Sequence, residues 1–257
     1  MRSLRIFLIA LMVTILIVNG KQVLTAQTPD LETKEKLVIA VKDNSRPLAF
    51  LNNSGELQGL EIDIAQKLAQ ELLGNQGTVT LVPVSNQERL NLVMEGKVDL
   101  AIARMTANAS RSQLVDFSSS YYLDGTGIIT KSPLIKNIQD LAAAKIALLD
   151  ESSTIPVISN RIKTAKLVPV NSYQQAYDLL ESGEALAFAA DQSILTGWTQ
   201  EHPEYRLIAQ SLSGEPLAIV MPKGLQYVSL RTQVNNALTT WRNNGWLKDR
   251  VDYWGLP

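Results

Sequence analysis

Two stretches of the chain share one pattern of apolar and polar positions, displaced from each other by 87 residues. In each stretch a short apolar run is followed by helical spacing, a glycine and a second apolar run, which predicts a strand–helix–strand unit. The predicted strand, helix and strand cover residues 79–84, 85–95 and 98–103 in the first unit and 166–170, 172–182 and 185–190 in the second. A further predicted strand precedes each unit, at residues 37–41 and 145–149.

Polar residues at the start of each repeated helix support this prediction. Both helices open with a capping box, Ser85-x-x-Glu88 and Ser172-x-x-Gln175, whose side chains satisfy amide donors that the first helical turn leaves unpaired. The duplicated alternation of strands and helices predicts two similar, Rossmann-like α/β lobes. A gap between two such lobes is a typical place for a small molecule to bind.

The rest of the pattern divides the chain between these lobes. The remaining predictions are a helix at 60–73, a polar, loop-like stretch at 106–120, a strand at 217–221, a helix at 229–244, and core anchors at Trp241, Trp246 and Trp254. If the last helix packs on the first lobe, the chain crosses between lobes twice, and two crossovers behave as a hinge. We therefore assign residues 36–122 with 217–257 to lobe 1, 126–212 to lobe 2, and 123–125 and 213–216 to the hinge crossovers.

The N-terminus has the composition of an export signal. Arg2 and Arg5 precede a run of 13 residues, 6–18, that is apolar except for one threonine. This run is shorter than the roughly 20 residues that span a bilayer and suits the core of a signal peptide. We expect residues 1–26 to be a signal peptide and the protein to be periplasmic, with an uncleaved N-terminal membrane anchor as the alternative.

Composition narrows the possible functions. The chain has 257 residues, 46% hydrophobic and 19% charged, which is typical of globular proteins. It has no cysteine and one histidine, His202, expected in a surface loop, so we expect no metal site and no cofactor. Removing residues 1–26 leaves more acidic than basic residues, whereas a nucleic-acid partner requires a basic face. We expect a monomer without a nucleic-acid partner.

Candidate ligand-binding residues follow the predicted strands, because ligands of open parallel sheets lie beyond the carboxyl ends of the strands. Arg104, Thr106 and Arg111 follow the strand at 98–103, and Asp191 follows the equivalent strand at 185–190. Arg104 and Asp191 occupy equivalent positions in the two units and carry opposite charges. After the strand at 145–149, Ser152, Ser153 and Thr154 read as the start of a helix, whose free amides and hydroxyls suit an anion.

Together these groups suit a zwitterion. Arg111 offers two parallel donors to a carboxylate, Thr106 and the 152–154 segment can add further donors, and Asp191 would accept from an ammonium group. Structural roles are also open, since Arg111 could pair with Asp116 and Asp191 could cap the following helix.

The chain resembles the bacterial extracellular solute-binding proteins of family 3, the polar amino-acid receptors of ABC importers. The matching motifs run in the family's order through Gly59-Leu60-Glu61-Ile62-Asp63, Arg89-Leu90, Gly96-Lys97-Val98-Asp99, Met105-Thr106, Arg111, residues 117–122, Asp191 and Asn244-Gly245-Trp246-Leu247. The resemblance covers nearly all of residues 36–255 and implies a type 2 periplasmic binding protein, or Venus flytrap. It also implies that Arg111 holds the α-carboxylate of an amino acid, Thr106 its head group and Asp191 its α-ammonium.

The chain departs from the family pattern at three places. Glu151 stands where glycine is usual, Arg104 replaces a residue that is usually small, and the aromatic residue common in the first long loop is replaced by Arg46-Pro47-Leu48, with Phe50 slightly later. We include Asp43 and Phe50 of that loop among the ligand-binding candidates. The extra arginines favour Glu, Asp or Gln as ligand, although Glu61 or Asp43 could reverse that preference.

The sequence therefore predicts a non-enzymatic receptor that captures an amino acid and delivers it to the permease of an ABC importer. The first alternative is a periplasmic dehydratase for prephenate- or arogenate-like compounds on the same scaffold, with Glu151 as a general acid. The second is a sensory module that binds a ligand and signals through a partner.

Overall fold

The computed structural model describes residues 34–74, 77–150, 152–208 and 211–257, all of which fall within one compact unit. The expected signal peptide and its alternative, an N-terminal anchor, lie outside the described residues. Within the described part of the chain, no helix has the length and apolar character needed to cross a membrane.

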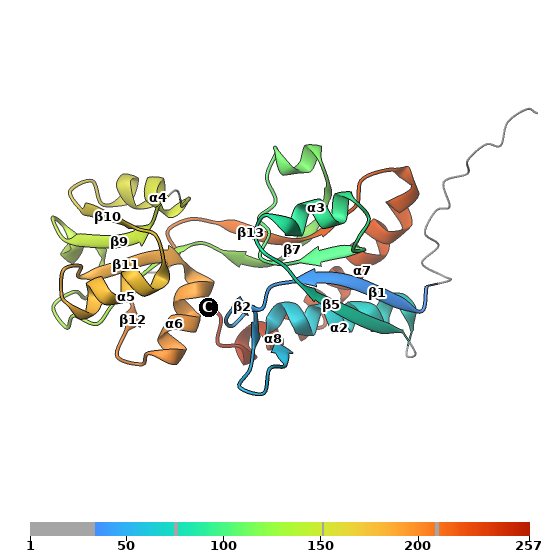
Figure 1. The fold of residues 1–257 in the computed structure, drawn as a ribbon, viewed down its shortest axis with the longest axis horizontal. Helices are drawn as coiled ribbons and strands as arrows, with labels where there is room; N and C mark the ends of the chain where they lie inside the picture. The colour runs from blue at the N-terminus through green and yellow to red at the C-terminus, as the bar shows by residue number, and fades with distance from the viewer. Residues whose placement is uncertain (1–33, 75–76, 151, 209–210) are drawn as a thin grey trace, which may run out of the picture. The chain divides into compact units, whose positions relative to one another are not determined.

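The first five-stranded sheet combines parallel and antiparallel strands (Figure 1). In spatial order its strands are β5 (Thr78–Pro83), β1 (Lys36–Val41), β6 (Leu100–Ile102), β13 (Glu215–Met221) and β7 (Asp116–Asp124). Strand β1 lies parallel to β5 and β6, whereas β13 lies antiparallel to β6 and β7. The parallel strands put their carboxyl ends at one edge of the sheet, where the candidate residues follow β6.

The second five-stranded sheet repeats this arrangement. Its strands are β10 (Lys166–Val170), β9 (Lys145–Leu149), β11 (Ala187–Asp191), β8 (Thr126–Thr130) and β12 (Arg206–Leu207). Again three strands are parallel, and the fourth is antiparallel to both neighbours. The predicted duplication of an α/β unit is confirmed. A small third sheet consists of β2 (Asn44–Ser45), β3 (Ala49–Leu51) and β4 (Leu57–Gln58).

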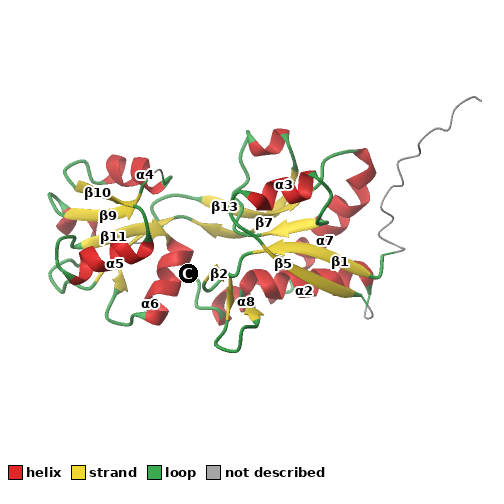
Figure 2. Cartoon of the chain, viewed as in Figure 1, coloured by secondary structure: helices red, strands yellow, loops and turns green. Residues whose placement is uncertain are grey.

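Helices cover both faces of each five-stranded sheet (Figure 2). The α-helices are α2 (Leu60–Leu73), α3 (Glu88–Met94), α4 (Thr154–Arg161), α5 (Tyr173–Glu181), α6 (Gln192–Glu201), α7 (Val228–Asn243) and α8 (Trp246–Tyr253). Short 3-10 turns occur at Arg111–Gln113, Ile138–Leu141 and Leu225–Tyr227.

Alternation along β1 shows how the sheet is covered. Leu37, Ile39 and Val41 belong to the apolar cluster that includes α2 and α7, while Val38 and Ala40 face a second cluster that includes α3. Successive side chains of a strand point to opposite faces, so a continuous apolar run is what a strand covered on both faces requires.

The three C-terminal tryptophans anchor the core of lobe 1, as predicted. Trp241 is fully buried, and Trp246 and Trp254 pack against the same cluster. Their indole nitrogens find partners as well: Trp241 donates to Glu71 Oε1 at 3.1 Å and Trp254 to Asp63 Oδ2 at 2.8 Å.

The two capping boxes differ in the structure. Ser85 Oγ accepts from the Glu88 amide at 3.3 Å, and Glu88 Oε2 accepts from the Ser85 amide at 2.9 Å, so the first box is complete. Ser172 Oγ accepts from the Gln175 amide at 3.1 Å, but Gln175 Oε1 accepts from Asn171 instead. The second box is therefore half formed.

The prediction of a loop over 106–120 is wrong at its C-terminal end, where β7 begins at Asp116. Its serines fit a strand because their polar atoms have partners outside β7: Ser118 Oγ accepts from the Ile219 amide at 2.9 Å, and the Ser119 amide donates to Asn235 at 2.8 Å. Helix α8 was not predicted either. It starts after Gly245, whose φ of 84° allows the sharp turn from α7.

The two crossovers between the sheets lie side by side. Glu215 is in register with Asp124 at the start of the β13–β7 pair, and the Thr126 amide donates to Ser213 Oγ at 2.9 Å. A Cβ on Gly125 would come within 1.8 Å of Ser211 Oγ, so only glycine fits there. The proposed hinge residues 123–125 and 213–216 are thus bonded to each other, while the lobe limits stay a prediction.

Candidate functional site

The backbone after β6 turns sharply at Arg104. Its φ of 52° lies in the left-handed region, which costs a non-glycine residue about 1–2 kcal/mol. The Arg104 amide donates to Glu61 Oε1 at 2.7 Å, and Arg89 Nη1 donates to the carbonyls of Ala103 and Arg104 at 2.5 and 2.6 Å. These three hydrogen bonds stabilise the strained turn through backbone atoms of Ala103 and Arg104. The Arg104 side chain can therefore make other contacts.

Glu61 supports this turn from the core. It is completely buried, and its Oε1 also accepts from the Tyr121 hydroxyl at 2.5 Å. Its Oε2 has no hydrogen-bond partner among the described residues. Burial raises the pKa of Glu61, because the charged form loses its hydration, and raises the pKa of Tyr121 well above its ordinary value. Burial and the neighbouring Arg104 lower the pKa of Arg89 to about 10.

Arg104 and Asp191 pair with each other. Arg104 Nη2 lies 2.5 Å from Asp191 Oδ2, and both side chains are 22% exposed. This ion pair joins the end of β6 in the first sheet to the end of β11 in the second. Asp191 is the N-cap residue of α6, but its side chain makes no capping hydrogen bond, so the capping alternative is wrong. The expected ammonium acceptor therefore already has a cation from the chain itself.

Charges around the pair stabilise the guanidinium. Burial alone would lower the pKa of Arg104, but the negative charge of Asp191 and its acidic neighbours outweighs it, so the pKa is raised. Burial raises the pKa of Asp124 and of Glu215, and the Asp191 charge acts in the same direction on both. Arg104 thus lies among several acids at the crossovers.

Arg111 and Thr106 lie together, as predicted, next to β13. Arg111 Nη1 donates to the Thr106 carbonyl at 2.9 Å, and the Thr106 backbone pairs with Leu217 of β13 in an isolated antiparallel β-bridge. The alternative pairing with Asp116 is wrong, since Asp116 pairs with Arg231 at 2.9 Å. Arg111 is half-buried and has no ion pair with an acid in the described part of the chain. Its guanidinium keeps donors for a further carboxylate.

Ser152, Ser153 and Thr154 lie at the start of a helix, as predicted. Ser153 is the N-cap residue of α4 without a side-chain cap, and Thr154 is buried. Ser152 Oγ is buried without a hydrogen-bond partner among the described residues. Glu151 lies outside the described residues. The role of this segment in holding a ligand carboxylate stays a prediction.

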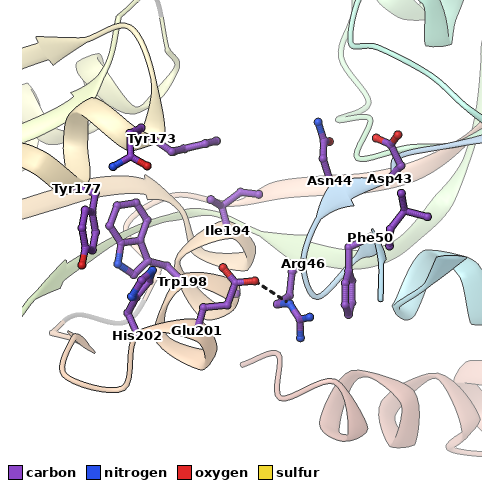
Figure 3. A pocket seen from close by; sticks show the side chains of 13 residues that line it. Asp43, Asn44, Arg46, Phe50, Tyr173, Tyr177, Ile194, Trp198, Glu201 and His202 are labelled. Atoms are coloured by element: carbon purple, nitrogen blue, oxygen red, sulfur yellow. Dashed lines mark ion pairs between the residues drawn. The ribbon is translucent and has the colours of Figure 1, made fainter. Parts of the chain in front are cut away.

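A cavity of about 520 Å³ lies between residues of the first long loop and residues of α5 and α6 (Figure 3). Of the predicted site residues, Asp43 and Phe50 line it, while the other seven do not. Its lining is Asp43, Asn44, Arg46, Phe50, Leu51, Tyr173, Gln174, Tyr177, Ile194, Gly197, Trp198, Glu201 and His202. The residues predicted from strand ends and those that form the cavity are thus largely different sets.

Arg46 forms one end of the cavity. Its Nε lies 3.1 Å from Glu201 Oε1, and its guanidinium carbon lies 3.9 Å above the centre of the Phe50 ring. Figure 3 shows this ion pair between the loop and α6. A Cβ on Gly197 would come within 2.3 Å of the Arg46 carbonyl oxygen, so glycine is required for α6 to approach the loop. Phe50, a predicted ligand-binding residue, lines the cavity with Arg46 stacked on its ring.

Aromatic residues of α5 and α6 form the opposite wall (Figure 3). The Tyr177 ring lies 5.0 Å from His202 and 6.0 Å from Trp198, centre to centre. His202 lies at the surface just after α6, as predicted, with its side chain 38% exposed, and it also lines the cavity. Trp198 and His202 are four residues apart, and so are Tyr173 and Tyr177. This spacing places each pair on one helix face and was the signal that sequence reasoning missed.

Tyr173 connects the cavity to the Arg104–Asp191 pair. It lines the cavity, and the positive charge of Arg104 acts on the pKa of its hydroxyl. Burial raises the pKa of Tyr173, and the positive charge of Arg104 partly offsets this. Neither Arg104 nor Asp191 lines the cavity itself.

Comparison with known proteins identifies the family. Residues 37–257 match the bacterial extracellular solute-binding proteins, family 3. The chain belongs to this family. The family resemblance inferred from the ordered motifs is confirmed, and members of family 3 are, as their description states, extracellular.

Individual family 3 relatives and solved structures agree in fold. The ABC transporter glutamine-binding protein GlnH of Bacillus subtilis (strain 168) is 28% identical over 218 residues, which are 84% of this chain and 79% of GlnH. An ancestral arginine-binding protein bound to arginine matches with a TM-score of 0.67 and 26% identity, over 86% of this chain and 98% of that one. The predicted fold, two α/β lobes of the type 2 periplasmic binding proteins, is confirmed.

A second solved structure is an ancestral amino acid-binding protein described as a precursor of cyclohexadienyl dehydratase. It matches with a TM-score of 0.67 and 25% identity, over 86% of this chain and 95% of that one. Binding proteins and a dehydratase lineage therefore share this scaffold.

Proposed function

We propose that the protein captures a polar amino acid between its two lobes in the periplasm and delivers it to the membrane permease of an ABC importer. It acts as a monomer and without a cofactor. Arg111 holds the ligand carboxylate, assisted by Thr106 and the 152–154 segment, and Asp191 receives the ammonium once Arg104 has moved aside. Glutamine, glutamate and aspartate are the preferred ligands.

The observation that supports this proposal is a cavity lined by residues from both lobes. Arg111 does not line this cavity, but it has no acidic partner among the described residues. The cavity volume of about 520 Å³ is within the range of small-molecule sites. A ligand that contacts both lobes favours their closed arrangement through its higher affinity for that state. The names of relatives, which include glutamine- and arginine-binding proteins, support an amino acid as the ligand class.

The direct test is a thermal-shift screen of the protein without residues 1–26 against the twenty amino acids, followed by titration calorimetry on each hit. A ligand that binds only the folded state raises the melting temperature. Stabilisation by one or a few polar amino acids supports the proposal. The absence of any shift across all twenty, with no heat of binding, contradicts it.

A dehydratase is the second candidate, favoured by the solved neighbour described as a precursor of cyclohexadienyl dehydratase. The test is incubation with prephenate and with arogenate, with the aromatic product followed by ultraviolet absorbance. Steady turnover identifies an enzyme, whereas stoichiometric binding of an amino acid without turnover identifies the receptor.

A further inference from the structure

Arg104 places a cation of the chain on the carboxylate that was expected to hold a ligand's ammonium. The contact is direct, with 2.5 Å between Arg104 Nη2 and Asp191 Oδ2, and it is shielded, since each side chain is only 22% exposed. The positive charge of Arg104 also acts on Tyr173, which lines the cavity. If Asp191 receives the ammonium, as the proposed function has it, the pair occupies that position and satisfies Asp191 before any ligand arrives.

The backbone at this point is suited to glycine, and the chain nevertheless carries arginine. Arg104 has a φ of 52°, and its turn is held by Glu61 and Arg89 through backbone atoms alone. The side chain is not needed to form the turn. A strained position that persists points to a role for the residue that occupies it, and here the only ion pair of that side chain within the described residues is with Asp191.

The charge balance of the site follows from this pairing. If Asp191 had no partner, a ligand without an ammonium would leave a partly buried carboxylate uncompensated, which strongly disfavours binding. With Arg104 in place, Asp191 is neutralised whichever ligand binds. Arg111 still offers donors to a carboxylate, and an oxo oxygen next to that carboxylate can accept from the remaining Arg104 donors.

We propose that Arg104 is a built-in substitute for the ligand's ammonium, and that the site therefore accepts 2-oxo acids alongside the corresponding amino acids. The inference rests on the proposed function, because it concerns the ligand of the same site. An amino acid must displace Arg104 from Asp191 in order to bind, whereas a 2-oxo acid binds with the ion pair intact. Arg104 is thus the residue that determines specificity for or against an ammonium group.

The test is titration calorimetry with matched pairs of ligands that differ only at the α-carbon. The pairs are L-glutamate with 2-oxoglutarate, L-glutamine with 2-oxoglutaramate, and L-arginine with its 2-oxo analogue. In the unsubstituted protein we expect the 2-oxo acid of the binding pair to bind at least as tightly as its amino acid. In Arg104→Gly the amino acid should gain at least tenfold in affinity and the 2-oxo acid should lose at least tenfold.

Two further variants keep the test decisive. Ala143→Gly makes the same kind of substitution at a second non-glycine residue with positive φ, 62°, on the exposed surface, and should leave every affinity unchanged. Adding Asp191→Asn to Arg104→Gly removes both charged groups of the ion pair. The double variant should no longer prefer the amino acid over its 2-oxo acid. If Arg104→Gly folds poorly, Arg104→Ala replaces it in the same comparison.

The possible results separate the two proposals. If the protein binds amino acids and Arg104→Gly leaves the ratio of amino-acid to 2-oxo-acid affinity unchanged, the role proposed for Arg104 is overturned. The receptor function then still stands. The role of Arg104 is also overturned if the unsubstituted protein binds amino acids tightly but binds no 2-oxo acid. Failure of both ligand classes to bind any variant overturns the receptor function, and this inference falls with it.

Discussion

The two copies of the repeated unit end differently at their third strands. After β6 the backbone enters the left-handed region at Arg104, supported by buried Glu61 and Arg89. After β11 the backbone passes at Asp191 directly into helix α6 without a capping bond from its side chain. One copy thus holds its charged residue in a strained loop, and the other holds it at a helix start. The comparison shows that a duplicated fold can place complementary charges at equivalent positions while their local structures diverge.

The largest expected effect concerns Arg111, which lies in the same copy as Arg104 but donates to a carbonyl and not to Asp191. Arg111→Ala should weaken amino-acid binding by tens- to thousands-fold, about 1.4–4 kcal/mol, because it removes a charge-assisted fork from the ligand carboxylate. Titration calorimetry measures the loss, and urea unfolding checks that stability is kept.

Arg242→Ala is the matched control for this variant. Arg242 also donates to a single backbone carbonyl, that of Ser120 at 2.8 Å, but is exposed on α7. Its removal should leave affinity unchanged. Wild-type affinity in Arg111→Ala would remove this residue from the site.

The next effect compares the two ends of the ion pair. Asp191→Ala leaves the Arg104 guanidinium without its ion-pair partner, while the Arg104 backbone stays strained. This substitution should lower the free energy of unfolding by about 2–3 kcal/mol. Arg104→Gly leaves a carboxylate unpaired but also relieves about 1 kcal/mol of backbone strain, so its cost should be clearly smaller. Urea unfolding of both variants gives the comparison. Equal losses would show that the left-handed backbone contributes no strain.

A smaller difference is expected between the two helix caps. Ser85→Ala breaks a complete capping box and should cost about 1 kcal/mol, whereas Ser172→Ala breaks a half-formed box and should cost about 0.5 kcal/mol. The two substitutions are chemically identical, so each is the control for the other in chemical denaturation. A larger loss for Ser172→Ala would contradict the difference in cap geometry.

The smallest effect is a change in the pH dependence of stability. Burial raises the pKa of Glu61 in the folded protein, so the folded state binds this proton more tightly than the unfolded chain does. Stability is therefore lost as the pH rises from the unfolded-state pKa towards the raised folded-state pKa. Glu61→Gln cannot titrate but keeps an oxygen for Tyr121 and the Arg104 amide.

Unfolding free energies measured from about pH 4 to pH 8 should therefore fall more steeply with rising pH in the unsubstituted protein than in Glu61→Gln. Parallel curves would show that Glu61 titrates alike in both states.

Local patterns predicted much of the fold. Strands β9 and β10 and helix α2 begin and end at the predicted residues, because each is an apolar run or amphipathic stretch bounded by charges or glycine. Strand β7 was partly missed, since its serines find their partners on β13 and α7, far away in sequence. Such partners leave no local pattern.

The candidate site was predictable only in part for a related reason. The equivalence of Arg104 and Asp191 was visible in the sequence, but their contact depends on where the two lobes lie. The aromatic wall from Tyr177 to His202 likewise depends on how α5 packs beside α6. Spacing within a helix could have identified the faces but not the cavity between them.

Helix α6 starts at the crossovers and runs along the cavity. The Gln192 amide donates to the Gly125 carbonyl at 2.6 Å, and Ser193 donates to Asp124. From Ile194 to Glu201, residues of the same helix line the cavity. Because a helix transmits displacement along its length as a stiff rod, we expect a twist of the connecting strands to swing the far end of α6 towards or away from Arg46. The size of the cavity would then be set at the crossovers, which contact the start of the same helix.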